Sequence, residues 1–146
     1  MNPVDQLTTD HEYYRAEFDW LAVDEGGEMA LLSSAGSGPV PGQALEDCDF
    51  LEGIVEYLLR LRETGAATAR SGRPIPKEFW EIARRGVYLF RWNDMKGDYE
   101  LLVAPDQPLR SDDESAGKVG IVARRVRLPV RFRSGRPVPA DVRVDR

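Results

Sequence analysis

Residues 18–32 read FDWLAVDEGGEMALL, and this stretch decides the fold. Two apolar runs, 18–23 and 29–32, lie on either side of the Gly26-Gly27 pair. A tight turn between paired strands needs positive φ, which glycine adopts at little cost. The segment therefore predicts a β-hairpin, and a hairpin is the unit of an antiparallel sheet.

A second hairpin is predicted further along the chain. Residues 87–92 (VYLFRW) are rich in the aromatic and branched side chains that favour strands. The polar stretch 93–98 predicts a turn, and residues 99–103 (YELLV) predict the returning strand.

Two helices are predicted between the hairpins. The first begins near 44–47 and ends before Gly65, because its apolar residues recur at helical spacing: Leu51, Ile54, Val55, Leu58, Leu59 and Leu61. The second, shorter helix starts at Pro76, which fits a first helical turn, and ends at Gly86. Residues 66–73 are expected to be a flexible connection.

The last third of the chain alternates like strands. Residues 119–123 and 126–132 place apolar side chains at every second position, with arginines between them in the second segment. Pro129 cannot donate a ladder hydrogen bond, so the second segment is expected at a sheet edge or with a break. Residues 134–146 predict a short final strand.

Together these elements predict an α+β fold, a twisted antiparallel sheet of about five to six strands with two helices packed on one face. The chain of 146 residues fits a single domain, 1–146. Residues 1–16 are expected to form a partly ordered leader, and residues 105–117 a long surface loop. No apolar run approaches the ~20 residues of a membrane span, and the start lacks the pattern of a signal peptide, which predicts a cytoplasmic protein.

Charge is divided unevenly along the chain. Residues 1–75 hold 14 acidic and five basic side chains, whereas residues 76–146 hold 11 acidic and 15 basic ones. The segment 118–136 has seven basic residues and no acidic one. It suggests an anion-binding or nucleic-acid-binding surface made of Arg125, Arg127, Arg131 and Arg133. The net charge of −5 and the lack of interleaved aromatic residues disfavour nucleic acid.

The sequence contains few residues that could form a catalytic site. Cys48 and His11 are the only cysteine and histidine, and nothing in the sequence brings them together. The acidic clusters in the two hairpins and in the long loop match no calcium motif and are read as turn residues. No cofactor or metal is therefore expected, although an enzyme of unknown class that uses carboxylates remains an alternative.

Residues 18–41, a hairpin followed by a Gly/Pro loop, resemble the opening of small bacterial proteins of the type that gives immunity to polymorphic toxins. The resemblance implies a stoichiometric inhibitor that covers the active site of a toxin. It supplies no functional residues.

The function predicted from the sequence is a non-catalytic protein-binding module, with another protein as the partner. An acidic surface would suit a basic partner by electrostatic steering. The candidate contact residues are Glu52, Glu56, Trp80, Asp112, Asp113 and Glu114. The acidic side chains also fit an alternative role as solubilising surface charges.

Overall fold

The computed structural model describes residues 7–8 and 17–144. Most of the predicted leader, including His11, lies outside the described residues. Within it, β1 (Leu7–Thr8) pairs with β4 (Val40–Pro41) in a small antiparallel sheet.

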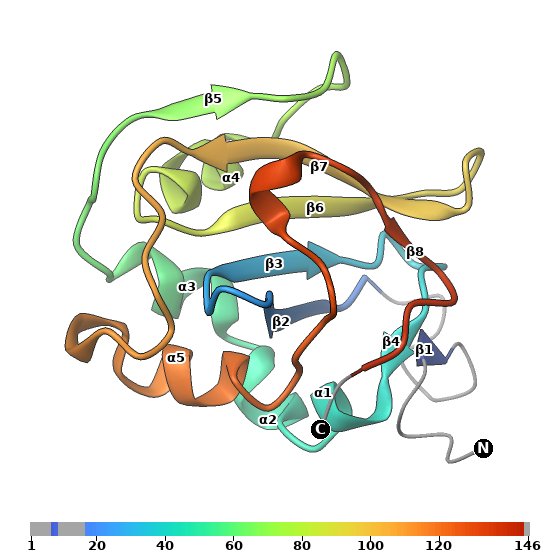
Figure 1. Ribbon diagram of the computed structural model, residues 1–146, viewed down its shortest axis with the longest axis horizontal. Helices are drawn as coiled ribbons and strands as arrows, with labels where there is room; N and C mark the ends of the chain where they lie inside the picture. The colour runs from blue at the N-terminus through green and yellow to red at the C-terminus, as the bar shows by residue number, and fades with distance from the viewer. Residues whose placement is uncertain (1–6, 9–16, 145–146) are drawn as a thin grey trace.

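The main sheet has six strands in the order β2-β3-β6-β7-β5, with β8 also paired to β7 (Figure 1). Their bounds are β2 Asp19–Val23, β3 Met29–Ser33, β5 Ala67–Ala69, β6 Tyr88–Asn93, β7 Asp98–Pro105 and β8 Val138–Pro139. The predicted α+β class is confirmed. Both predicted hairpins are also confirmed, because β2 pairs antiparallel with β3, and β6 with β7.

One pair of strands differs from the predicted antiparallel pattern, because β3 and β6 run parallel. The sheet is therefore mixed. The chain between these two strands carries four helices, and a parallel pair requires a long crossover of this kind.

The predicted helix from 44–47 onward consists of three short helices, α1 (Gly42–Leu45), α2 (Cys48–Leu51) and α3 (Ile54–Leu59). The breaks fall at Asp47 and Gly53, whose φ/ψ values of −109°/22° and −103°/16° leave the helical region. The bent path still buries Leu51, Ile54 and Leu58.

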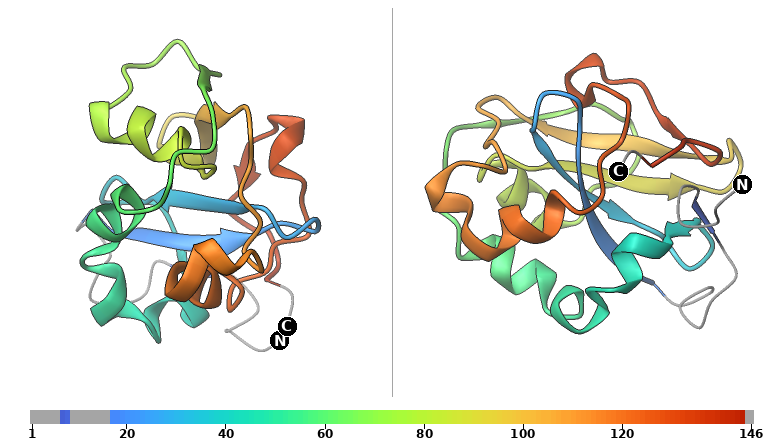
Figure 2. Two further views of the ribbon diagram at one scale, coloured as in Figure 1. Left: turned by 90° about the vertical axis from the view of Figure 1, so that its left-hand side faces the viewer. Right: turned by 60° about the horizontal axis from the view of Figure 1, so that its bottom comes forward.

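The second predicted helix is present as α4 (Lys77–Ala83). Phe79 is buried on it, and Trp80 is half-buried against the core. In Figure 2, α3 and α4 lie together on one side of the sheet, opposite the C-terminal segment.

The strand predicted at 119–123 is wrong, because these residues belong to the helix α5 (Gly117–Ala123). The buried side is formed by Val119, Gly120, Val122 and Ala123, which is a helical spacing, while Ile121 is exposed. α5 packs against β2 and β3.

The alternating segment 126–132 is also not a strand. Val23 bonds Val126 and Leu128 through its backbone groups, and beyond Pro129 the chain turns into the 3₁₀ helix η3 (Phe132–Ser134). Beyond Pro129 the Glu25 N–H still bonds the Val130 carbonyl, but the Val130 N–H turns back to the Leu128 carbonyl, so no regular ladder continues. The arginines of this segment therefore do not form one stripe.

The remaining predicted segments are placed as follows. In the final segment, Val138–Pro139 forms β8, Arg143 makes an isolated bridge, and Val142 and Val144 on either side of it are buried. The connection 66–73 contains β5. The loop 105–117 is largely exposed and includes the 3₁₀ helix η2 (Glu114–Ala116).

Candidate functional site

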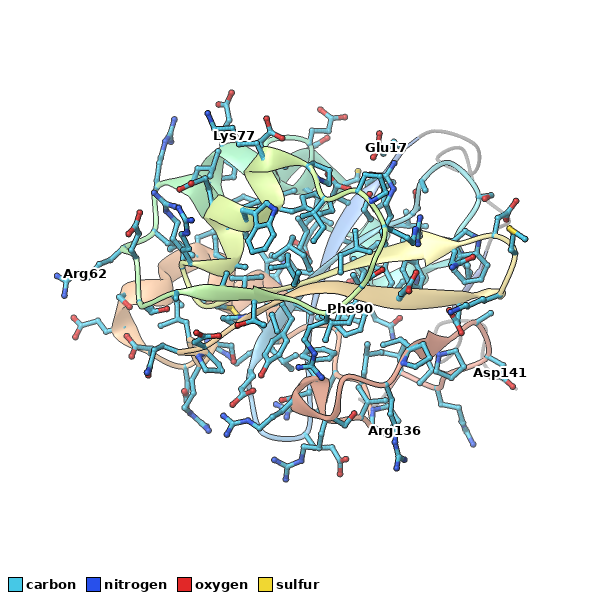
Figure 3. The ribbon with its side chains drawn as sticks, turned by 90° about the horizontal axis from the view of Figure 1, so that it is seen from above. Glu17, Arg62, Lys77, Phe90, Arg136 and Asp141 are labelled. Carbon is cyan, nitrogen blue, oxygen red and sulfur yellow. The ribbon has the colours of Figure 1, made fainter. Side chains whose placement is uncertain are left out.

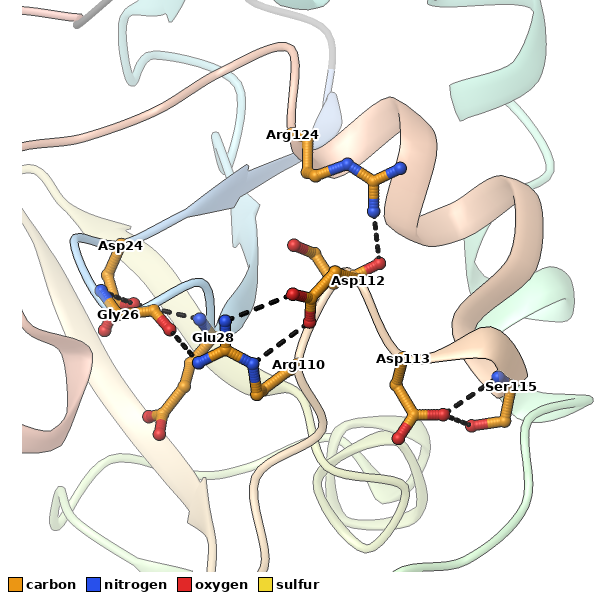
Figure 4. Close-up of polar contacts among 9 residues, drawn as sticks. Asp24, Gly26, Glu28, Arg110, Asp112, Asp113, Ser115 and Arg124 are labelled. Atoms are coloured by element: carbon orange, nitrogen blue, oxygen red, sulfur yellow. Dashed lines mark hydrogen bonds and ion pairs between the residues drawn. The ribbon is translucent and has the colours of Figure 1, made fainter.

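The three acidic loop residues predicted to contact a partner, Asp112, Asp113 and Glu114, are all exposed. Asp112 and Asp113 also make contacts that stabilise the loop. Asp112 pairs with Arg110, whose Nε lies 3.0 Å from Oδ1, and Arg110 also donates to the Gly26 carbonyl at 2.7 Å (Figure 4). Asp113 caps η2 by accepting from the Ser115 N–H at 2.9 Å. These hydrogen bonds lower the pKa values of Asp112 and Asp113. Only Glu114 lacks such a local role in the contacts described.

Glu52 and Glu56 lie on a different surface. Both are exposed next to α2 and α3, as is Asp49. The rings of Phe50 and Tyr57, which are sequence neighbours of Asp49 and Glu56, stack with centroids 4.6 Å apart and an interplanar angle of 5°. Tyr57 is 38% exposed, and the Arg60 guanidinium lies 5.7 Å from the centre of its ring, so the ring stands at the surface beside this cation and the nearby carboxylates.

Helix α5 borders this surface. Lys118 Nζ lies 5.8 Å from the centre of the Phe50 ring, and Arg125 pairs with Asp47. Ile121, one turn after Lys118 in α5, is 45% exposed. We call this surface the helical face: Asp49, Phe50, Glu52, Glu56, Tyr57, Lys118 and Ile121. Trp80, on α4, is outside this set.

The four predicted anion-binding arginines separate into two groups. Arg125 is neutralised by Asp47, and the backbone of Arg127 bridges to Val23. Arg131 and Arg133 are exposed near the β2–β3 turn. The structure therefore brings together only the second pair.

Two adjacent hollows share Arg131. The smaller, of about 340 Å³, is also lined by Ser134 and Arg136, and the larger, of about 470 Å³, by Arg110 and Arg133. We call them together the arginine hollow. Arg110 and Arg136 were not singled out by the sequence, because they lie outside the alternating segment and only the folded chain brings them to this place.

Asp24 anchors the floor of the arginine hollow. It is 1% exposed, and its Oδ1 accepts the backbone N–H of Gly26 and Glu28 at 2.9 and 3.0 Å. Its Oδ2 accepts the Phe132 N–H at 3.0 Å. This carboxylate thus ties the hairpin turn to the C-terminal segment.

Glu28 lines the larger part of the arginine hollow and contacts two side chains there. Its carboxylate accepts from Arg133 at 3.0 Å and from the Tyr88 hydroxyl at 2.9 Å. Burial and the hydrogen bond to Glu28 raise the pKa of Tyr88, so the phenol stays protonated and remains a donor at neutral pH.

A polar row that the sequence did not reveal crosses the main sheet. Asp19, Ser33, Arg91 and Glu100 are successive register partners on β2, β3, β6 and β7. Arg73 reaches Glu100 at 2.9 Å. Partial burial alone would raise the pKa of Glu100, but the hydrogen bonds from Arg73 and its neighbours lower it. No short motif marks such a row, since its members come together only through strand register.

No catalytic constellation emerges from the described residues. Cys48 is half-buried, and its Sγ lies 4.0 Å from a carboxylate oxygen of Asp49. Within residues 7–8 and 17–144, no group of three or more His, Cys, Asp or Glu side chains is placed to hold a metal ion.

Among the described helices, none is long and apolar enough to cross a membrane. Comparison with known proteins found no protein-family model, no curated protein and no solved structure that matches the chain.

Proposed function

We propose that the protein binds another protein through the helical face, as an immunity-type inhibitor of a toxin. The observation that carries this proposal is the exposed Tyr57 ring, stacked on Phe50 and accompanied by Glu52 and Glu56. Tyrosine is enriched among the residues that dominate binding energy at protein interfaces. An exposed ring held by stacking loses little conformational freedom on binding.

The charges of the helical face favour a basic partner. Asp49, Glu52 and Glu56 are exposed and have no ion pair among the contacts of the described chain. Exposed carboxylates of this kind accelerate encounter with a positively charged surface and make the association rate depend on salt. The active sites of enzymes that act on nucleic acids present such a surface, so an inhibitor that covers one fits this chemistry.

The test begins with co-expression of the tagged chain and the products of its neighbouring genes. We expect one product to co-purify in a one-to-one complex and to be toxic when expressed alone. Glu52→Lys and Glu56→Lys should each slow association about tenfold at low salt, as measured by biolayer interferometry. Tyr57→Ala should mainly raise the dissociation rate, because it removes a central contact.

Asp141→Lys is the matched control, since Asp141 is an exposed acid that follows β8 and is outside α2, α3 and α5 (Figure 3). It should leave both rates within about twofold of the parent values. A complex that forms but responds equally to Glu52→Lys and Asp141→Lys, and not to Tyr57→Ala, would contradict the assignment to the helical face. Failure of every neighbouring product to bind would contradict the immunity role.

A further inference from the structure

Some of the guanidinium groups around the arginine hollow already form ion pairs within the protein, and others do not. Arg133 pairs with Glu28, and Arg110 pairs with Asp112. Arg131 and Arg136 are exposed and have neither an ion pair nor a side-chain hydrogen bond among the contacts of residues 17–144. Arg131 and Arg136 are therefore available to bind a ligand. Arg131 lines both parts of the arginine hollow, and Arg136 lines the smaller part.

The hairpin turn lets the guanidinium groups come close to the backbone. A Cβ on Gly26 would lie 2.8 Å from Arg131 Nη1, and one on Gly27 would lie 3.2 Å from Arg110 Nη2. Arg131 and Arg110 thus lie against adjacent glycines of one turn. Glycine at these positions leaves the room that the two arginine side chains occupy.

The carboxylates nearby are committed to structure. Asp24 is buried and satisfied by three backbone N–H groups, and Glu28 accepts from Arg133 and Tyr88. Glu25, on the rim of the smaller hollow, is exposed to solvent, which screens its charge. Asp24 ties together the backbone beneath the hollow and Glu28 holds Arg133 in place, whereas Arg131 and Arg136 line the hollow without a carboxylate partner in the described chain.

We propose that the arginine hollow binds a small anion with two adjacent phosphate groups. The planar guanidinium fork matches the geometry of phosphate oxygens and forms paired charge-assisted hydrogen bonds with them. Because Arg131 lines both hollows, with Arg136 in one and Arg133 in the other, neighbouring phosphates can be held on its two sides. The Ser134 hydroxyl, which accepts from the Arg136 N–H at 3.2 Å, still has its own hydrogen to donate.

A compact ligand fits these observations better than a nucleic-acid strand. The cations gather in a hollow and do not follow an extended strand. The aromatic side chain in its lining, Phe132, is 1% exposed and presents no ring for base stacking. The whole chain carries a net charge of −5, which opposes a long polyanion.

Isothermal titration calorimetry with inorganic pyrophosphate tests the proposal. We expect binding at a single site, weakened about tenfold or more by Arg131→Gln and by Arg136→Gln, since each removes a charge-assisted contact. Arg62→Gln is the matched control, because Arg62 is exposed and projects from a different side of the molecule than Arg136 (Figure 3). It should leave the affinity within about twofold.

Gly26→Ala tests the geometry without changing any charge. Its Cβ would displace the Arg131 guanidinium, which is the flexible end of a side chain, so the fold should persist. Thermal unfolding should confirm a native transition, while pyrophosphate affinity should fall several-fold. An unchanged affinity in this variant and in Arg131→Gln would overturn the role of Arg131.

Further ligands distinguish the sources of the phosphate. Inorganic phosphate should bind more weakly than pyrophosphate, and a short single-stranded oligonucleotide should bind no more tightly than pyrophosphate does. No heat of binding with millimolar pyrophosphate, or equal losses in Arg62→Gln and Arg131→Gln, would overturn the proposal. Tyr57→Ala should leave pyrophosphate binding intact, which keeps this test separate from that of the helical face.

Discussion

At the scale of single residues, Asp19 shows the cost of placing a carboxylate in a sheet. Its Oδ1 is buried and has no hydrogen-bond partner among the described residues. The Ser33 hydroxyl oxygen lies 3.3 Å from a carboxylate oxygen of Glu17. Burial raises the pKa of Asp19, and this outweighs the opposing effects of Ser33 and Arg91. The folded protein therefore holds the Asp19 proton more tightly than the unfolded chain does.

Asp19→Asn is expected to make the protein more stable at neutral pH. A raised folded-state pKa means that Asp19 favours folding at low pH and that this advantage is lost as the pH rises through the folded pKa. Asparagine imitates the protonated acid, so the stability of the variant relative to the parent should increase from acidic to neutral pH. Urea unfolding across this range measures the difference. A difference that stays constant with pH would show that Asp19 is not perturbed.

At the scale of elements, α5 depends on a close approach between a helix and a loop. The carbonyl oxygen of Ser111, a buried residue, accepts from Arg124 at 2.5 Å and lies against Gly120. A Cβ on Gly120 would overlap this oxygen, so glycine is required there although it weakens a helix elsewhere. The apolar pattern of residues 119–123 is compatible with either a strand or a helix. The close packing of Gly120 on the loop favours the helix.

Gly120→Ala is expected to destabilise the protein by about 1–3 kcal/mol, although alanine is the better helix former. The reason is that the obstructing atom belongs to the backbone of Ser111 and cannot rotate away. Urea unfolding measures the change. Gly72→Ala is the matched control, because its Cβ would meet no atom within 4 Å, and it should stay within about 0.5 kcal/mol of the parent. A neutral or stabilising Gly120→Ala would mean that α5 is not packed on the loop in this way.

At the scale of the whole molecule, the C-terminal segment covers one face of the sheet and α3 and α4 cover the other (Figure 2). Phe132 is 1% exposed, and its ring centroid lies 5.7 Å from that of Tyr88 and 5.4 Å from that of Phe90. Its backbone N–H is held by Asp24. One residue thus closes the core and positions the arginines on either side of it, Arg131 and Arg133.

Phe132→Ala is expected to cost about 3–5 kcal/mol of unfolding free energy, because it leaves a cavity against Tyr88 and Phe90. The same variant should weaken pyrophosphate binding while the native fold persists at low temperature, since the two neighbouring arginines lose their support. Denaturant unfolding and calorimetry supply the two measurements. Met95→Ala, at a side chain that is 98% exposed, should alter neither. A loss below about 1 kcal/mol would contradict the view that this segment closes the core.

The candidate sites were predicted in part. Glu52 and Glu56 follow from helical spacing, and Arg131 and Arg133 follow from the basic run. The strand register that aligns Asp19 with Arg91 and Glu100, and the packing that brings Arg110 beside Arg131, join residues far apart in the chain. Local spacing carries no information about such contacts.

The sequence by itself determined the two hairpins and α4, because turn glycines, alternating apolar residues and a helix-opening proline act through neighbouring residues. Only the tertiary structure decided the parallel pairing of β3 with β6, the helical state of α5 and the irregular path of 126–132. The physical reason is that an apolar pattern states which side chains must be buried, whereas the elements already packed determine which backbone conformation buries them.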